Sequence, residues 1–542
     1  MKRRDFIGAA LTAGAVAASG EVVAAPTVKS GSAVQLNEAG VAQLQAAMQD
    51  GTLTARSLTA FYLKRIAEID KRGPCINAVI EINPDALAIA TALDRERREK
   101  GPRGPLHGIP VLIKDNIATV DKMATTAGSL ALVGARAPHD SFVAAQLRAA
   151  GAVILGKTNL SEWANMRSTR STSGWSGRGG LTRNPYALDR NTSGSSSGSA
   201  AAVAANLAAL AVGTETDGSI VSPSSICGLV GIKPTLGLVS RNGIVPIAHS
   251  QDTAGPMARS VADAALLLNA LSGVDERDPV TRESAGRVPD YARFLDKDGL
   301  RGARIGVARN FFGGNDEVDA VIEQALLVLK AQGAVLVDPL DIPNTAKYQD
   351  SELDVLLYEF KTDLRAYLAE FAPGFAIGDM AGVIAFNEQH HDRELPYFGQ
   401  EYLVKAQAKG GLDEKAYLDA LANDRRYARE EGIDKVMKEN RLDALVAPTG
   451  GLAWVTDFID GDHAGASFST PAAVAGYPHI TVPAGQVHGL PVGLSFVAGA
   501  YAEGPLIRLA YAYEQATRLR RPPQFHASVS PSRPEPRLKT GA

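Results

Sequence analysis

The chain has 542 residues, of which 45% are hydrophobic and 21% are charged, and its formal net charge is −3. This is the composition of an ordinary globular protein that can bury a large core. A net charge so close to zero, with no long run of one sign, gives no electrostatic basis for binding nucleic acid or an anionic membrane, so we expect a small-molecule or peptide partner and no nucleic acid.

Residues 1–25 predict an export signal. Basic residues 2–4 precede a weakly apolar run that ends in small residues near Ala25. Because the paired arginines are followed by "DFI", the segment resembles a twin-arginine signal, the type that exports folded proteins. We therefore expect cleavage near Ala25 and a periplasmic or secreted protein. The run is too short and too rich in glycine to cross a membrane, and no later stretch of about 18 apolar residues follows, so we expect no membrane span.

Strands and helices alternate after a helical region that extends from residue 36 to about 100. Apolar runs predict strands at 108–116, 151–158 and 230–235, and the intervening patterns predict helices at 141–150 and 199–210. Strand-like runs return at 443–450, 479–485 and 492–499, before a helix at 505–517. Such alternation predicts an α/β fold. Since both ends of the chain show it, we expect one large sheet crossed by distant parts of the sequence.

The rest of the chain is divided by composition. We expect the main domain at 26–520, with a helical and more charged insertion or cap at 315–439, and a loose proline-rich tail at 521–542. Cys75 and Cys227 are too few to form a disulfide framework, and we interpret them as buried free thiols, with a pairing left open.

Two short motifs match patterns that their surroundings do not support. Residues 151–158, "GAVILGKT", match the phosphate-loop pattern, but a helix precedes them and their apolar, partly β-branched interior predicts a strand. "GSSSG" at 194–198 matches the nucleophile elbow of serine hydrolases, with Ser196 as nucleophile. That elbow requires an apolar strand directly before it, and "NPYALDRNTS" predicts a turn.

Three other stretches together point to a different catalytic arrangement. They are "HGIPVLIKDN", which ends an apolar strand with Lys114; "GSSSGSAAAVAAN", which holds Ser195; and "TDGSI…CGLVGIKPT", which holds Ser219. In this order they resemble the amidase signature family, and the resemblance extends through "GAVILGKTNLSEWA" and "DTAGPMARSVADA" over most of the chain. The runs "GWSGRGGLTRNPY" and "GTETDGSIV" are most similar to those of bacterial peptide amidases.

The resemblance implies a fold and a set of catalytic residues. The fold is a single large α/β domain with a central mixed β-sheet flanked by helices. Lys114 matches the family's catalytic lysine, Ser195 its bridging serine on a cis peptide, and Ser219 its nucleophile. The backbone N–H groups of four consecutive residues form the oxyanion hole: Thr216, Asp217, Gly218 and Ser219.

The chemistry of these residue types agrees with those roles. A serine hydroxyl needs a neighbouring base, and a neutral lysine amine can serve. Because free lysine has a pKa of about 10.4, burial must lower the pKa of Lys114 before it can act near pH 7. On spacing alone, an ion pair between Lys114 and Asp115 remains an equal alternative. The other serines, Ser196, Ser197 and Ser199, are expected to cap the following helix or to pack its first turn.

The sequence departs from the commonest family pattern near the nucleophile. Glu215 replaces the usual aspartate, Asp217 a glycine and Val221 an arginine, and Ser193 and Ser197 replace glycines of the serine loop. These changes leave the three catalytic groups in place and bear on substrate choice. Our hypothesis is that Asp217 sets a carboxylate beside the scissile bond, which repels acids and favours neutral amides.

These observations predict an exported serine hydrolase that cleaves carboxamides to an acid and ammonia, with C-terminal peptide amides as the expected substrates. No metal or organic cofactor is expected, since no cluster of side chains has ligand spacing. Two alternatives remain open. One is a fatty-amide or aryl-amide hydrolase with a pocket near Trp163 or Trp175. The other is the amidase subunit of a tRNA-dependent amidotransferase.

Overall fold

The computed structural model describes residues 35–529. The predicted export signal therefore lies outside the described residues, as does the end of the predicted tail, 530–542. No helix within the described part combines the length and the apolar character that crossing a membrane requires.

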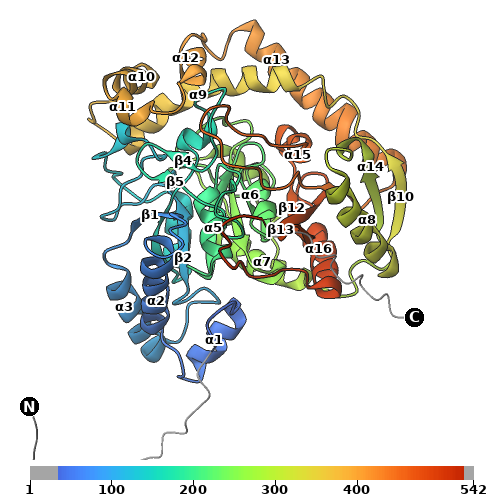
Figure 1. Ribbon diagram of the computed structural model, residues 1–542, viewed down its shortest axis with the longest axis horizontal. Helices are drawn as coiled ribbons and strands as arrows, with labels where there is room; N and C mark the ends of the chain where they lie inside the picture. Colours follow the sequence, from blue (N-terminus) through green and yellow to red (C-terminus); the bar gives the residue numbers. More distant parts are fainter. Residues whose placement is uncertain (1–34, 530–542) are drawn as a thin grey trace, which may run out of the picture.

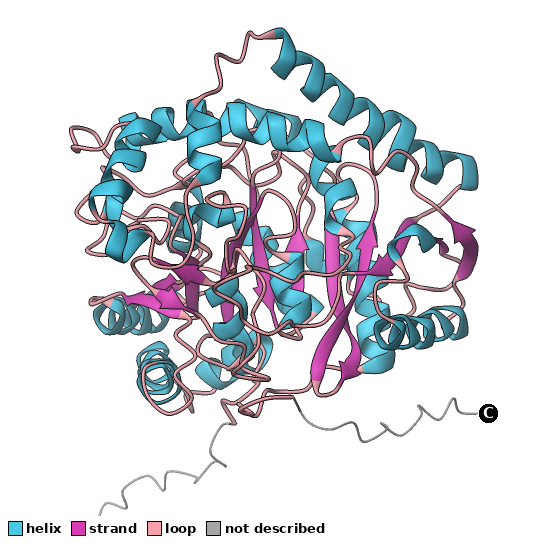
Figure 2. Cartoon of the chain, turned by 45° about the horizontal axis from the view of Figure 1, so that its top comes forward, coloured by secondary structure: helices cyan, strands magenta, loops and turns pink. Residues whose placement is uncertain are grey.

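Eleven strands of the described chain form one mixed sheet, which is the central layer of the molecule in Figure 2. Their spatial order is β1 (Val79–Ile82), β3 (Val153–Thr158), β2 (Pro110–Lys114), β6 (Leu210–Glu215), β8 (Thr253–Ala258), β7 (Val230–Lys233), β12 (His479–Val487), β13 (Leu490–Val497), β11 (Ala444–Pro448), β9 (Arg304–Ala308) and β10 (Val335–Leu340). The C-terminal hairpin β12–β13 lies between β7 and β11, so distant parts of the chain do share one sheet. The predicted single domain with a central mixed sheet flanked by helices is confirmed.

Helices cover the sheet on both sides (Figures 1 and 2). They are α1 (Val41–Gln49), α2 (Ala55–Arg65), α3 (Ala86–Lys100), α4 (Phe142–Ala149), α5 (Ser197–Ala204), α6 (Val221–Ile226), α7 (Val261–Leu271), α8 (Asp316–Ala331), α9 (Gln349–Phe371), α10 (Met380–Gln389), α11 (His391–Glu394), α12 (Glu401–Gln407), α13 (Lys415–Arg425), α14 (Asp434–Asn440), α15 (Ser469–Ala475) and α16 (Glu503–Thr517). A small hairpin, β4 (Trp175–Ser176) with β5 (Gly180–Leu181), lies outside the main sheet.

The region 315–439, which we expected to be helical, contains a strand as well as helices. Strand β10 falls within it and extends the sheet edge beside β9, and α8 packs against β12. The following helices, α9 to α13, arch over one side of the molecule (Figure 1). Helix α9 buries Phe360 and Leu364 in an apolar cluster that includes residues of the segments 118–135 and 245–248. This cluster fixes α9 above the strand ends.

Three further details differ from the sequence-based expectations or extend them. Strand β1 interrupts the region that the periodicity marked as helical up to residue 100. Cys75 and Cys227 are both free, and burial is correct for Cys227 but wrong for Cys75, which is exposed. Residues 521–528 of the predicted loose tail lie along 185–189, where the Phe525 N–H donates to the carbonyl of Pro185.

Helix α5 packs so closely on its neighbours that one of its residues must be glycine. A Cβ at Gly198 would lie 2.2 Å from the Ala78 carbonyl oxygen and 2.6 Å from that of Asn159. Both obstacles are backbone atoms, which cannot rotate away as a side chain would.

We predict that Gly198→Ala lowers the free energy of unfolding by about 1–3 kcal/mol, although alanine is the better helix former, because the overlap outweighs helix propensity. Thermal unfolding of the purified protein measures the change. Gly104→Ala is the matched control, since a Cβ there meets open space. Equal melting temperatures for the two variants would contradict the packing argument.

Candidate active site

Strand β2 carries Lys114 into the protein interior. β2 lies between β3 and β6 and runs parallel to both, so the carboxyl ends of these strands meet at one edge of the sheet. Lys114 is the last residue of β2 and is fully buried. Its Nζ lies 2.7 Å from Ser195 Oγ, 2.8 Å from Thr214 Oγ1 and 3.3 Å from the Thr214 carbonyl oxygen.

Burial changes the ionisation of this amine. Removal from water lowers the pKa of Lys114 to about 7, and the more distant Asp252 and Glu215, which favour the charged form, offset only part of that effect. A large share of Lys114 is therefore neutral near pH 7. A neutral amine carries a lone pair that can accept a proton.

The alternative ion pair between Lys114 and Asp115 is wrong. Asp115 accepts hydrogen bonds from Thr126 Oγ1 at 2.5 Å and from the Gly128 N–H at 3.2 Å. It pairs instead with Arg178 at 3.3 Å. Consecutive residues at a strand end point in opposite directions, and this separates the two charges. Within residues 35–529, Lys114 forms no ion pair.

Ser195 comes from the loop that precedes α5. The peptide bond between Gly194 and Ser195 is cis. The Ser195 carbonyl accepts the N–H of Ser161 at 3.1 Å. A side chain at position 194 would overlap Ser161 Oγ, so the loop requires glycine there. Ser195 Oγ lies between Lys114 Nζ and Ser219 Oγ, 2.7 Å from the former and 2.9 Å from the latter.

The neighbouring serines hold this loop and do not cap the helix. Ser196 precedes α5, but its hydroxyl bonds the backbone of Thr214, donating to the carbonyl at 3.0 Å and accepting from the N–H at 3.2 Å. Ser197 Oγ donates to the Ser193 carbonyl at 2.6 Å, and Ser199 Oγ donates to that of Val212 at 3.1 Å. The expected side-chain cap is therefore wrong, whereas the hydroxyls do pack the first turn of α5. The Ser196 hydroxyl is already hydrogen-bonded to the backbone of Thr214, which argues against Ser196 as the nucleophile of an elbow motif.

Ser219 is the outermost of the three aligned side chains. It exposes 8% of its surface, compared with 1% for Ser195 and none for Lys114. Its carbonyl accepts the N–H of Ser196 at 3.2 Å, which ties the two loops together. A molecule that enters from solvent therefore reaches Ser219 first.

The loop 216–219, which we name the oxyanion loop, follows directly after β6. Glu215 Oε2 accepts the N–H groups of Ile220 at 2.7 Å and Val221 at 3.0 Å, which satisfies the start of α6. Gly218 has a φ of +76°, a left-handed conformation that favours glycine. The N–H groups of 216–219 donate to no other group in the described part of the chain. They remain available to an anionic oxygen beside Ser219.

The rear of the oxyanion loop is fixed by three side-chain hydrogen bonds. Thr216 Oγ1 donates to Asp252 Oδ1 at 2.5 Å, and Gln251 Nε2 donates to the Thr216 carbonyl at 3.3 Å. On the other side, Thr470 Oγ1 of α15 donates to Asp217 Oδ2 at 2.6 Å. The segment 247–252, which supplies Asp252 and Gln251, therefore supports the loop.

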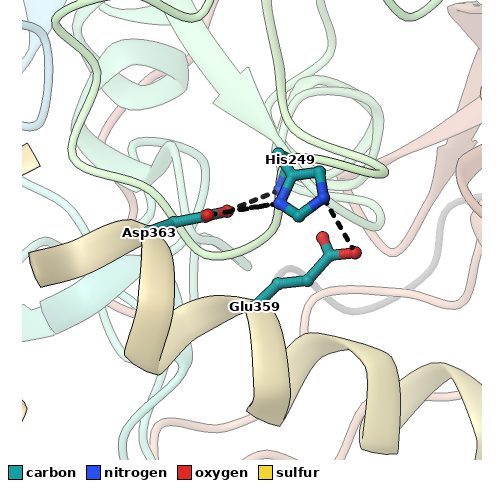
Figure 3. A group of neighbouring side chains, drawn as sticks. All are labelled: His249, Glu359 and Asp363. Carbon is teal, nitrogen blue, oxygen red and sulfur yellow. Dashed lines mark hydrogen bonds and ion pairs between the residues drawn. The ribbon is translucent and has the colours of Figure 1, made fainter. Parts of the chain in front are cut away.

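The segment 247–252 is itself anchored to α9 through His249 (Figure 3). His249 Nδ1 lies 2.9 Å from Asp363 Oδ2, and Nε2 lies 3.4 Å from Glu359 Oε1. The pKa of His249 is raised because hydrogen bonding and attraction to Asp363, with help from Glu359, outweigh burial. These three side chains are close enough to hold a metal ion. However, Glu359 already accepts from the Ser250 N–H and Tyr417 Oη, so we interpret the group as an ion-paired anchor.

The rejected phosphate-loop motif forms strand β3, as its apolar residues predict. Lys157, the lysine of the motif, is buried and donates to the Ile117 carbonyl and to Thr125 Oγ1. Its amine is therefore directed into protein and not toward a nucleotide.

Several residues of the site carried no recognisable signal in the sequence. Asn116 Nδ2 donates to Thr214 Oγ1 at 3.0 Å, and Thr214 in turn contacts Lys114. Asn116 lies only two residues after Lys114, so its presence in the site could have been predicted from its position in the sequence. Asp252, Gln251 and Thr470 come from distant segments, and only the folded chain brings them to the oxyanion loop.

Comparisons with known proteins establish the family of the chain. A protein-family model described as Amidase matches residues 57–507. A probable amidase of Arabidopsis thaliana is 41% identical over 516 residues, covering 93% of this chain and 95% of the relative. A subunit of the glutamyl-tRNA(Gln) amidotransferase of Halorhodospira halophila is 36% identical over 504 residues, covering 89% and 98%.

Among solved structures, the native peptide amidase of Stenotrophomonas maltophilia superimposes with a TM-score of 0.86 at 55% identity, covering 90% of this chain and 99% of that one. Matches of this extent show the family. The chain belongs to the amidase signature family and is an enzyme that acts on the C–N bond of amides.

Proposed function

We propose that the enzyme hydrolyses carboxamides to an acid and ammonia, with Ser219 as nucleophile and Ser195 and Lys114 as its proton relay. The observation that carries this proposal is the unbroken chain of contacts from Lys114 Nζ to Ser195 Oγ at 2.7 Å and on to Ser219 Oγ at 2.9 Å. Both distances suit proton transfer.

The hydrogen-bonding capacity of Lys114 supports this relay. A neutral amine has two N–H groups and one lone pair. Thr214 offers two acceptors, its hydroxyl and its carbonyl, and these accommodate both N–H groups. The lone pair is then left for the hydroxyl of Ser195, which can donate its proton as it accepts one from Ser219.

In this mechanism Ser219 Oγ attacks the amide carbonyl while its proton passes through Ser195 to Lys114. The tetrahedral oxyanion accepts hydrogen bonds from the N–H groups of the oxyanion loop. The C–N bond then breaks, and the nitrogen takes the proton from the relay and leaves as ammonia. Water repeats the sequence on the acyl-enzyme and releases the acid.

Likeness to the S. maltophilia enzyme, whose name is peptide amidase, supports C-terminal peptide amides as the substrates. The amidotransferase relatives support the alternative that the chain is the amidase subunit of a larger complex. The other alternative is a fatty-amide or aryl-amide hydrolase, for which a pocket near Trp163 or Trp175 was predicted. The side chains of both tryptophans are buried. We further propose action outside the cytoplasm, on the basis of the twin-arginine-like leader in residues 1–25.

We predict that the purified chain, without any partner protein, releases ammonia from a peptide amide faster than from a fatty amide or an anilide. Lys114→Ala, Ser195→Ala and Ser219→Ala should each reduce kcat/KM at least about 10³-fold, because each interrupts the same relay. Ser199→Ala is the matched control, since its hydroxyl bonds the Val212 carbonyl and lies outside the relay. Full activity in Ser219→Ala, or activity that requires partner proteins, would contradict the proposal.

The pH dependence follows from the state of Lys114. The relay needs the neutral amine, which exists above the pKa, so kcat/KM should rise with pH around a midpoint near the pKa of about 7. At pH 5 it should be roughly a hundredfold below the plateau. A pH–rate profile measured on a peptide amide tests this. A profile that is flat from pH 5 to 8 would exclude Lys114 as the titrating base.

The hypothesis for Asp217 predicts an effect on binding. Asp217→Asn removes the negative charge of a carboxylate in the oxyanion loop, so a peptide with a free C-terminal carboxylate should inhibit the variant about tenfold more strongly, while KM for the corresponding peptide amide changes little. The inhibition constant of the acid and the KM of the amide, measured for both proteins, give the comparison. An unchanged ratio would remove Asp217 as a selectivity residue.

A further inference from the structure

Helix α9 reaches the oxyanion loop through a second group besides the His249 anchor. Glu352, in the first turns of α9, is buried, and its Oε1 accepts a hydrogen bond from Gln251 Nε2 at 2.9 Å. The same amide nitrogen of Gln251 lies 3.3 Å from the Thr216 carbonyl. Gln251 thus bridges α9 and the oxyanion loop.

Glu352 also meets the oxyanion loop directly, at Asp217. One oxygen of Asp217, Oδ2, accepts from Thr470 Oγ1 at 2.6 Å. The other, Oδ1, is buried and receives no hydrogen bond from an amide, hydroxyl or cation in residues 35–529. The carboxyl groups of Asp217 and Glu352 are close neighbours that act on each other's ionisation, and within the described chain Asp217 Oδ1 has no donor other than the one that a protonated Glu352 could supply. Two carboxyl groups can share a hydrogen bond only when one of them carries a proton.

We propose that Glu352 is a positioning residue that works as a neutral carboxylic acid, donating a hydrogen bond to Asp217 and so holding the N–H groups of the oxyanion loop in place. The proposal rests on the proposed function, in which this loop binds the oxyanion. It assigns to α9, more than 130 residues away in the sequence, a part in transition-state stabilisation.

The surroundings of the two carboxyls determine which one is protonated. Burial, Asp217 and Asp424 of α13 raise the pKa of Glu352 well above its usual range. Burial also raises the pKa of Asp217, but the hydroxyls of Ser469 and Thr470 and the charge of Lys233 oppose this. The charged groups that act most strongly on Glu352 are both negative and its one side-chain donor among the described residues is the neutral amide of Gln251, whereas Asp217 has two hydroxyl donors and a cation. Glu352 is accordingly the group that keeps the proton.

This arrangement has a limit at high pH. Once Glu352 loses its proton, it can no longer donate to Asp217, and two negative charges lie side by side behind the oxyanion loop. The loop N–H groups should then lose their alignment. Activity that rises with pH as Lys114 becomes neutral should therefore fall again when Glu352 ionises, giving a bell-shaped profile.

Two substitutions at one position separate the neutral acid from an ionised one. In Glu352→Gln, the amide Nε2 can donate to Asp217 and Oε1 can still accept from Gln251, at any pH. We expect this variant to keep kcat within about threefold and to lose the alkaline limb of the profile. Glu352→Ala removes both hydrogen bonds, so we expect kcat to fall at least about tenfold with little change in KM. Asp350→Asn, an exposed position in the first turn of α9, is the control for charge and should match the wild type.

Thermal unfolding gives a readout that does not depend on activity. A carboxyl whose pKa is raised by folding takes up a proton when the chain folds, so its contribution to stability falls as pH rises from its unfolded pKa, about 4.3, toward its folded value. The melting temperature of Glu352→Gln should therefore rise relative to that of the wild type as the pH increases from 4.5 to 8. Asp350→Asn should show no such trend.

The outcomes distinguish the proposal from the proposed function. If the wild type releases no ammonia from any amide, the proposed function fails, and the melting curves still decide the state of Glu352. If the wild type is active and Glu352→Gln loses as much kcat as Glu352→Ala, an ionised carboxylate is required and the proposal is overturned. It is also overturned if both variants retain full kcat, or if the melting difference is independent of pH.

Discussion

The requirement for an uncharged lysine in the protein interior determines how the site is built. Lys114 is surrounded by hydroxyl and carbonyl groups, and the carboxylates of its neighbourhood are directed elsewhere. Asp115, the next residue, is neutralised by Arg178, and Glu215 is occupied by the N–H groups of Ile220 and Val221. A carboxylate in direct contact would restore the charge of the amine and remove its lone pair. The ion pair and the hydrogen bonds that occupy these carboxylates are therefore as important to Lys114 as its own contacts.

The sheet brings the reacting groups together because β2 and β6 are parallel neighbours. Their carboxyl ends deliver Lys114, Thr214 and the oxyanion loop to one edge, and α5 begins at the same edge with Ser195 just before it. Support for the loop comes from more distant segments. Helix α9 lies over this edge and reaches the loop through His249 and Glu352, so the region that the sequence marks only as charged and helical contributes directly to the site.

Apolar periodicity was sufficient to predict the α/β class and the shared sheet, and the resemblance to the amidase signature family supplied the three aligned side chains. The sequence was insufficient where tertiary packing determines which side chains contact each other. The spacing of Lys114 and Asp115 suggested a pair, but strand geometry separates them. Ser196 stands where a helix cap belongs, yet its hydroxyl bonds Thr214 on the adjacent strand. Glu352 and Thr470 lie far from Asp217 along the chain, and no local pattern links them. The four-residue strand β1 is too short to interrupt a helical periodicity visibly.

The insertion of the β12–β13 hairpin between β7 and β11 has a consequence for biosynthesis. Residues 231–233 pair with residues 479–481, so the middle of the sheet stays incomplete until nearly the whole chain has left the ribosome. Until then β7 presents an unpaired edge, the kind of surface through which nascent chains aggregate. Such a topology favours a sheet that is completed only at the end of synthesis, and it makes protection of the β7 edge by chaperones important until then.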